Sequence, residues 1–244
     1  MNFQKNAPPM VRKDDVKNIQ LNHLLTGKIT LIGERKTPSG INKQTVNRKL
    51  FLGKEGFEGD EQGDKKHHGG PDKAIHHYPF EHYALWMKEI ATNSILNSPG
   101  AFGENFSTTG LDETNVALGD VFRIGTALIE VSQGRQPCWK LNARFGVNNM
   151  ALRVQQNGRT GWYYRVLEEG YIEPGETFTR INRHTPEWPL YRLWKILYVD
   201  MLNYNELEAM ATLQNLPDGW RHYAQKRLKT RKIEDWSKRL EGDH

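Results

Sequence analysis

Apolar positions in the first three quarters of the chain fall into short runs separated by turns that contain glycine. These runs lie at residues 26–33, 45–46, 49–52, 116–118, 121–124 and 127–131. Gly119-Asp120 and Gly125-Thr126 separate the last three runs, which predicts a tight antiparallel meander. Many short strands of this kind favour a β-barrel or a sandwich over a doubly wound α/β sheet.

Helical periodicity appears twice within this β-rich region. Between Glu81 and Ile90, Tyr83 and Trp86 recur at the spacing of one helix face. A second helix is predicted from about Asn149 to Gln156, and Gly158 is placed to end it.

After Arg183 the pattern changes from strands to helices. Residues 184–189 contain two prolines and are predicted to form a linker. Helices are then expected over 190–199, over 204–214 with Asn203 as N-cap, from Asp218 as N-cap to Leu228, and over 233–240. Residues 1–22 lack periodicity. We therefore predict an N-terminal arm at 1–23, a β-rich domain at 24–183 and a C-terminal helical extension at 188–241.

Composition narrows the classes of protein that fit. No apolar run approaches the roughly 18–20 residues that a membrane-spanning helix needs, so no membrane partner is expected. The first twenty residues lack the apolar core of a secretory signal. A single cysteine excludes an intrachain disulfide and a four-cysteine iron–sulfur cluster, and it fits a reducing compartment. The predicted location is therefore cytoplasmic.

The net charge of +5 is concentrated near the C-terminus. The segment from Gly219 to Leu240 contains eight basic residues and two acidic residues. This segment is interpreted first as a solvated helical face, and alternatively as a docking surface for an acidic electron donor or a weak nucleic-acid contact. Nucleic acid is not an expected partner.

Cys138 stands just past a predicted strand, with Arg135 before it and Lys140 after it. Nearby positive charge favours the thiolate, which attacks electrophiles and binds soft metals. The alternative is a small buried hydrophobic residue, which is the role of most lone cysteines. Local charge alone leaves both interpretations open.

Five histidines lie within sixteen positions, at 67, 68, 76, 77 and 82. A zinc site is not favoured, because no HExxH pattern occurs and Gly69-Gly70-Pro71 interrupts any helical pairing. The segment Lys65–Lys73 instead combines cationic side chains with glycines, a pattern suited to holding an anion, although an exposed turn with solvated charge is the simpler alternative. Asn105, in the turn that follows Gly103, could bind the edge of a heterocycle or cap its own turn.

Taken together, several motifs resemble the MOSC family, the domains related to the C-terminal part of molybdenum cofactor sulfurase. They occur in the family's order over about residues 24–183. The helices that follow are similar to the three-helix extension of the bacterial YiiM-type subgroup. The motifs are Gly56-Phe-Glu-Gly-Asp60, His68-Gly-Gly-Pro-Asp-Lys-Ala74, Phe102-Gly-Glu-Asn105, Leu118-Gly-Asp120 and Arg135-Gln-Pro-Cys138.

The resemblance implies a mainly β protein, a MOSC-type β-barrel with peripheral helices and a small all-α appendage. It implies a molybdenum–molybdopterin cofactor with Cys138 as the metal ligand, and His68 and Asp60 as catalytic residues that handle protons. One departure concerns Gly134, where the subgroup commonly has proline. The implied cofactor-binding residues are Lys43, Gly59, Asp60, His68, Gly69, Gly70, Asp72, Lys73, Asn105 and Arg135. Of His67 and His68, the second is favoured because it adjoins Gly69.

The implied activity is reduction of N-hydroxylated compounds, including nucleobases, hydroxylamines and amidoximes, to the parent amines. A single cysteine leaves no internal iron–sulfur cluster, so electrons are expected from an external flavoprotein or ferredoxin-type donor. The alternative function is a carrier of the cofactor or of sulfur without turnover of its own. A nucleic-acid-binding module leaves the barrel motifs unexplained, and a Cys/His hydrolase lacks any nucleophile-elbow pattern.

Overall fold

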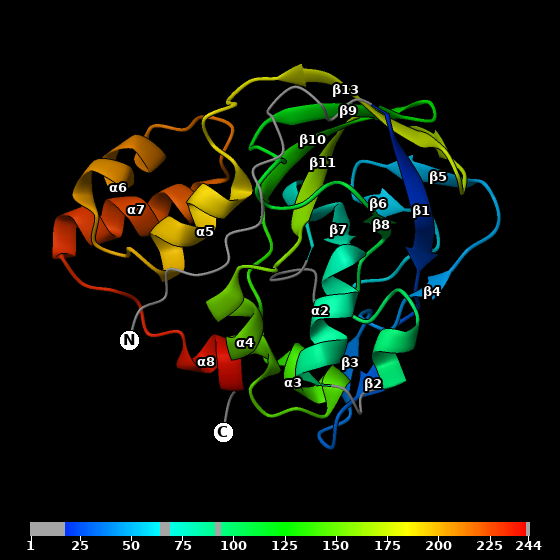
Figure 1. Cartoon of the computed structure of the whole chain (residues 1–244), viewed down its shortest axis with the longest axis horizontal. Helices are drawn as coiled ribbons and strands as arrows, with labels where there is room; N and C mark the ends of the chain where they lie inside the picture. The colour runs from blue at the N-terminus through cyan, green and yellow to red at the C-terminus, as the bar shows by residue number, and fades with distance from the viewer. Residues whose placement is uncertain (1–17, 64–68, 91–93, 243–244) are drawn as a thin grey trace.

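The computed structural model describes residues 18–63, 69–90 and 94–242. Seven strands form a closed barrel, because the first strand pairs both with β8 and with β13 (Figure 1). β7 and β8 run parallel and the other pairs are antiparallel, which makes the barrel mixed. In spatial order the strands are β13 (Thr177–Arg183), β9 (Asp120–Ile124), β10 (Ala127–Gly134), β11 (Trp162–Glu168), β7 (Ile75–Pro79), β8 (Phe106–Thr108) and β1 (Ile19–Thr26). The predicted mainly β barrel is confirmed.

Smaller elements surround the barrel. β4 (Gln44–Thr45) is an outer strand on β1, and two small sheets are β12-β5-β6 and β2-β3. Their strands are β2 (Thr30–Ile32), β3 (Thr37–Ser39), β5 (Leu50–Gly53), β6 (Gly56–Phe57) and β12 (Gly170–Ile172). The helices are η1 (Pro71–Lys73), α2 (Glu81–Glu89), η2 (Ser94–Asn97), α3 (Lys140–Phe145), α4 (Met150–Asn157), α5 (Leu190–Tyr198), α6 (Tyr204–Ala211), α7 (Asp218–Thr230) and α8 (Ser237–Glu241). Within the described part of the chain, none of them is long and apolar enough to cross a membrane.

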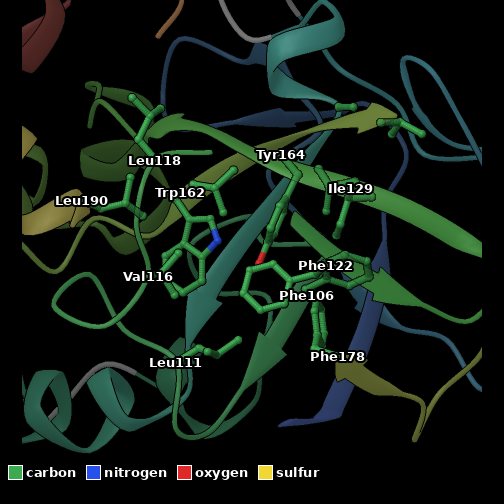
Figure 2. Packing of buried hydrophobic residues seen from close by; sticks show 14 of the residues in the cluster. Phe106, Leu111, Val116, Leu118, Phe122, Ile129, Trp162, Tyr164, Phe178 and Leu190 are labelled. Atoms are coloured by element: carbon green, nitrogen blue, oxygen red, sulfur yellow. The ribbon is translucent and has the colours of Figure 1, made fainter. Parts of the chain in front are cut away.

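Aromatic side chains fill the interior of the barrel (Figure 2). Phe106 and Phe178 meet edge to face, with ring centroids 5.2 Å apart. Phe122 contributes from the neighbouring strand, and Trp162 and Tyr164 from β11. Because side chains alternate across a strand, Trp162 and Tyr164 both face this core. The edge-to-face geometry adds to the stabilisation that comes from burying the rings.

The predicted meander is only half correct. β9 and β10 form the expected hairpin, with Gly125 at a φ of +54° in the turn. Residues 116–118 form no strand beyond one isolated bridge between Ala117 and Pro189. The Ala117 N–H donates to the Asp120 carboxylate at 2.9 Å, and the Leu118 N–H donates to the carbonyl of Trp188 at 2.9 Å. The N–H groups of Ala117 and Leu118 are therefore not available to pair with β9 in a sheet.

Two predicted boundaries near the N-terminus need correction. β1 begins at Ile19, so residues 19–23 belong to the sheet and not to the arm. The single run predicted over 26–33 is divided between the end of β1 and β2. A Cβ at Gly27 would lie 2.6 Å from the carbonyl oxygen of Asn42. The strand therefore ends where two backbone segments approach closely.

Three of the four predicted C-terminal helices occur close to where periodicity places them, and the fourth, predicted over 233–240, is the shorter α8 (Ser237–Glu241). α5, α6 and α7 form the three-helix region, with Asn203 as the predicted N-cap: its Oδ1 accepts from the Glu206 N–H at 3.3 Å. Asp218 is not the N-cap of α7 but its first residue, since Pro217 precedes the helix. Trp188, Leu193 and Trp220 of this region are buried in the same hydrophobic cluster as the barrel interior. The barrel and the helices therefore share one core.

Arg227 does not belong to the basic surface predicted for the C-terminal segment. Its side chain is fully buried, and its guanidinium is paired with Glu234 at 2.8 Å. It also donates to the carbonyl oxygens of Ile196 and Leu197 at 3.1 Å, near the end of α5. Arg227 on α7 therefore links the end of α5 to the segment that carries Glu234, in the interior of the helical region. Lys226 and Lys229 remain exposed.

Candidate functional site

A pocket of about 590 Å³, its open mouth included, lies where the segments after β3, β6 and β10 meet. Five residues predicted from the sequence line it: Lys43, Lys73, Asn105, Arg135 and Cys138. They come from four separate segments of the chain, with Arg135 and Cys138 in the same loop, so folding brings them together.

Cys138 is held in a loop between two regular elements. β10 ends at Gly134, and the Arg135 N–H donates to the carbonyl of Gly161 at 2.9 Å, which ties the loop to the start of β11. The Cys138 carbonyl accepts from the Leu141 N–H at 2.9 Å and begins the turn that leads into α3. The thiol is partly exposed and forms no disulfide. The sequence did not predict α3, whose six residues are too few to show periodicity.

Two buried polar atoms on the pocket wall lack hydrogen-bond partners among the described residues. They are Nη1 of Arg135, a residue that is 6% exposed, and Nε2 of His76, which is 5% exposed. Burial lowers the pKa of His76 well below its ordinary value, and the charge of Arg135 lowers it further. The ring is therefore neutral at physiological pH. Because buried polar groups are rarely left unpaired, these two atoms indicate a polar or anionic ligand.

Asp60 lies behind the wall and not on it. Its Oδ1 accepts from the Gly27 N–H at 2.8 Å, and its Oδ2 accepts from the Asn105 amide at 2.8 Å. The Lys43 ammonium donates to both oxygens, at 2.6 Å to Oδ1. A carboxylate engaged by three residues holds its neighbours in place, so Asp60 reaches the pocket only through Lys43 and Asn105.

Asn105 lines the pocket, but its amide is already in use. Its Nδ2 donates to Asp60 and to the carbonyl of Leu25 at 3.1 Å, while its Oδ1 accepts from the His76 N–H at 3.1 Å. Both N–H donors of the side-chain amide are therefore engaged within the protein, and only the second lone pair of Oδ1 is available to a ligand. Neither predicted role fits this arrangement: the N–H groups are not available to a heterocycle, and the side-chain partners His76, Leu25 and Asp60 lie outside the turn of Asn105. The side chain instead holds the pocket wall in place.

The turn before Asn105 is fixed by a fully buried carboxyl group, that of Glu104. It accepts from the Gly100 N–H at 2.7 Å, from the Phe102 N–H at 3.1 Å and from the hydroxyl of Tyr83. Burial raises the pKa of Glu104. Gly103 has a φ of +76°, and a Cβ there would lie 2.8 Å from the Ile41 side chain. The glycine thus lets the turn approach the segment after β3.

Several predicted cofactor-binding residues lie elsewhere. Asp72 accepts from the Arg165 Nε at 2.7 Å and does not line the pocket. Gly59 and Gly70 adopt positive φ values of +83° and +94° in turns, and neither they nor Gly69 line it. His68 lies outside the described residues, as does His67.

The three described histidines of the cluster point to different surroundings. His76 and His77 are consecutive in β7, so their side chains take opposite faces of the strand. His77 contacts Tyr164 at 3.0 Å inside the barrel, and His82 pairs with Glu113 at 2.8 Å. Over the described ranges, no three His, Cys, Asp or Glu side chains gather in a way that could hold a metal ion.

The pocket residues that the sequence did not assign to cofactor binding include His76, Lys140 and Tyr163. Lys140 is 8% exposed, and its Nζ has a long hydrogen bond of 3.5 Å to the carbonyl of Pro38. Burial raises the pKa of Tyr163, and nearby Arg135 opposes that rise. Its ring lies 5.1 Å from that of His76. Two of these residues had a sequence signal: Lys140 stands two residues after Cys138, and His76 belongs to the histidine cluster.

Comparison with protein families places two models on the chain. A model described as MOSC domain matches residues 64–179, and one described as YiiM-like, 3-alpha helix domain matches residues 188–231. The first thus covers most of the barrel and the cysteine loop, and the second covers α5 to α7.

Individual relatives agree with these matches. Protein YiiM of Escherichia coli strain K12 is 42% identical over 220 residues, covering 89% of this chain and 96% of that protein. The crystal structure of YiiM from Escherichia coli superposes with a TM-score of 0.77 over 91% of this chain and 98% of that one, at 34% identity. A protein named Reductase from Gibberella moniliformis is 35% identical over 193 residues, which are 79% of this chain and 34% of that protein.

Proposed function

The chain belongs to the MOSC family of molybdenum-cofactor-binding domains, in the group with a YiiM-like three-helix domain, and on that premise we propose that it is a reductase. Its proposed substrates are N-hydroxylated compounds: nucleobases, hydroxylamines and amidoximes. The proposed cofactor is molybdenum–molybdopterin, with Cys138 as the protein ligand of the metal. The name Reductase of the Gibberella moniliformis relative supports the reaction class.

One observation supports the proposal most strongly. The chain's single thiol lines the same pocket as two buried polar atoms, Arg135 Nη1 and His76 Nε2, that have no partner in the described parts of the chain. A thiolate suits a thiophilic metal, and a guanidinium suits the phosphate of the pterin. Lys73 and Lys140 add positive charge to the same wall. The residues present therefore fit the cofactor.

When bound, the cofactor would supply the two-electron chemistry that cleavage of an N–O bond requires. The chain's own residues would bind and orient it: Cys138 at the metal, and Arg135, Lys73 and Lys140 at negative charge. Conversion of a hydroxylamine to an amine and water consumes two electrons and two protons. Asp60 is held by Lys43, so proton delivery from this side would pass through the Lys43 ammonium. His68 remains a predicted participant.

The test is metal analysis of protein produced in a host that makes the cofactor. We expect stoichiometric molybdenum in the natural protein and its loss in Cys138→Ser. Arg123→Met, which removes an exposed ion pair with Glu168 away from the pocket, is the control and should keep its metal. Absence of molybdenum from the natural protein would overturn the proposal. Metal without steady-state reduction of an N-hydroxylated substrate by an artificial donor would instead indicate a cofactor carrier.

We further propose that electrons come from a separate flavoprotein or ferredoxin-type donor. The exposed lysines 226, 229 and 232 offer a positive surface for an acidic partner. The double variant Lys226→Gln/Lys229→Gln should slow reduction by the donor at low salt and weaken its salt dependence. An unchanged rate and salt dependence would assign these lysines to a solvated surface. Arg227 is omitted because it is buried.

A further inference from the structure

The segment that carries Cys138 is covered on one side by the C-terminal helices. α8 lies beside α3 and α4, close to the point where the chain leaves Cys138 (Figure 1). The Trp139 N–H donates to the carbonyl of Arg239 at 2.7 Å, and the Asn142 amide donates to the carbonyl of Leu240 at 2.7 Å. Two consecutive carbonyl groups of α8 thus hold the residues that follow the cysteine.

The bond to Trp139 has a clear physical role. Trp139 is the N-cap of α3, and the first N–H groups of a helix have no partner within the helix. Here a carbonyl from about 100 positions further along the chain satisfies that group. Gly242 completes the contact, because a Cβ at this position would lie 3.2 Å from the Trp139 indole. The loop after Cys138 is therefore fixed from outside the barrel.

Arg239 joins this contact to the helical region. Its backbone accepts from Trp139, while its Nη2 donates to the hydroxyl of Tyr223 on α7 at 2.7 Å. Its guanidinium also lies 4.7 Å from the Trp236 ring centroid, a cation–π contact. One residue therefore connects α7 to the neighbour of Cys138.

A second contact lies before the cysteine. A Cβ on Gly134 would lie 3.3 Å from Cη2 of Trp220 on α7, tighter than ordinary van der Waals contact. Because glycine has no Cβ, it admits the indole at the end of β10. The cysteine loop is thus held by α7 at its start and by α8 at its end.

We propose that the C-terminal helices position the Cys138 thiol, with Arg239 as the positioning residue that transmits the restraint through Trp139. The inference rests on the proposed function only in taking Cys138 as the functional thiol of the pocket. The helical region is then part of the site without lining it.

The test uses the chain's single cysteine as its own reporter in cofactor-free protein. We expect Arg239→Ala to raise the rate constant for alkylation of Cys138 by iodoacetamide about fivefold: the backbone carbonyl that accepts from Trp139 remains, but α8 loses the side-chain hydrogen bond to Tyr223 that anchors it on α7. Arg221→Ala is the matched control: it breaks an ion pair with Asp218 on α7 and should change the rate less than about twofold. Hydrogen exchange of the Trp139 amide should accelerate in the first variant and not in the second.

Equal alkylation and exchange rates in the natural protein and a folded Arg239→Ala variant would overturn the proposal. An equal rise in both arginine variants would also overturn it, because that result indicates general loosening. If Arg239→Ala does not fold, Tyr223→Phe removes only the acceptor hydroxyl and is judged by the same criteria. Absence of molybdenum from the natural protein would contradict the proposed function, but it would not affect these measurements, which use cofactor-free protein.

Discussion

Lys43 and Asp60 form the buried ion pair that supports the pocket wall. Their side chains are 7% and 5% exposed. Glu61, the residue after Asp60, pairs instead with Lys28, and the side chains of Lys28 and Glu61 are 66% and 40% exposed. Burial lowers the pKa of Lys43, and the Asp60 charge opposes that effect. The two neighbouring pairs thus place the same chemistry in two different environments.

Removing the lysine of each pair should separate these environments. Lys43→Met leaves a buried carboxylate without its ammonium and should lower the free energy of unfolding by about 3–5 kcal/mol. Lys28→Met should lower it by less than about 1 kcal/mol, because water already screens that pair. Urea denaturation of the two variants measures the difference. Equal effects would contradict the structural role assigned to Asp60.

His77 should make stability depend on pH. Burial lowers its pKa to about 3 in the folded protein, against 6.5 as the ordinary value. Between these values the unfolded chain binds a proton that the folded chain does not, so the free energy of unfolding decreases as pH falls from 6.5 towards 3. This residue contributes about 1.4 kcal/mol per pH unit within the window.

The pH dependence can be assigned to this side chain by substitution. His77→Gln should reduce the slope of unfolding free energy against pH between 6 and 4, measured from urea transitions at several pH values. An unchanged slope would mean that other groups carry the acid sensitivity.

Single residues differ in how far the sequence reveals them. The motifs predicted Cys138, Arg135 and Lys73 on the pocket because their residue types match their chemistry. The roles of Asp60 and Asn105 depend on partners far along the chain, such as Gly27 and Leu25, and no local pattern encodes these. His76 was missed as a binding residue because position in a strand, and not spacing to other histidines, points it into the pocket.

At the scale of elements, periodic segments were predicted well and short ones were not. α2, α5 and α6 follow their apolar spacing closely. The six-residue α3 and the segment 116–118 depend instead on tertiary contacts, with Trp188 among the partners. Elements that hold the cysteine loop belong to this second group, which is why the sequence located the cysteine but not its support.

The N-cap of α6 offers a direct test of local sequence reasoning. Asn203→Ala removes the acceptor for the Glu206 N–H and should lower the free energy of unfolding by about 1 kcal/mol. Asn205→Ala, at an exposed position within the same helix, should change it by less than about 0.5 kcal/mol. Thermal denaturation of both variants provides the comparison, and a similar shift in both would argue against the cap.

At the scale of the whole molecule, the barrel and the helical region should unfold together. Their apolar residues form one cluster, so neither part keeps its buried surface without the other. Arg227→Ala leaves Glu234 buried without its partner and should lower the free energy of unfolding by about 3–5 kcal/mol while keeping one transition. Calorimetry measures this, with exposed Lys226→Ala as control. Two separate transitions would contradict the shared core.

The pairing of β1 with β13, which closes the barrel, also affects the order in which the barrel folds. Ile19 and Phe178 meet across this seam although about 160 residues separate them in the sequence. Closing so long a loop loses chain entropy before pairing returns any free energy, so the seam should form late in folding. Until then strand edges stay open and can pair with another chain. Refolding yield should therefore fall as protein concentration rises, with no disulfide chemistry involved.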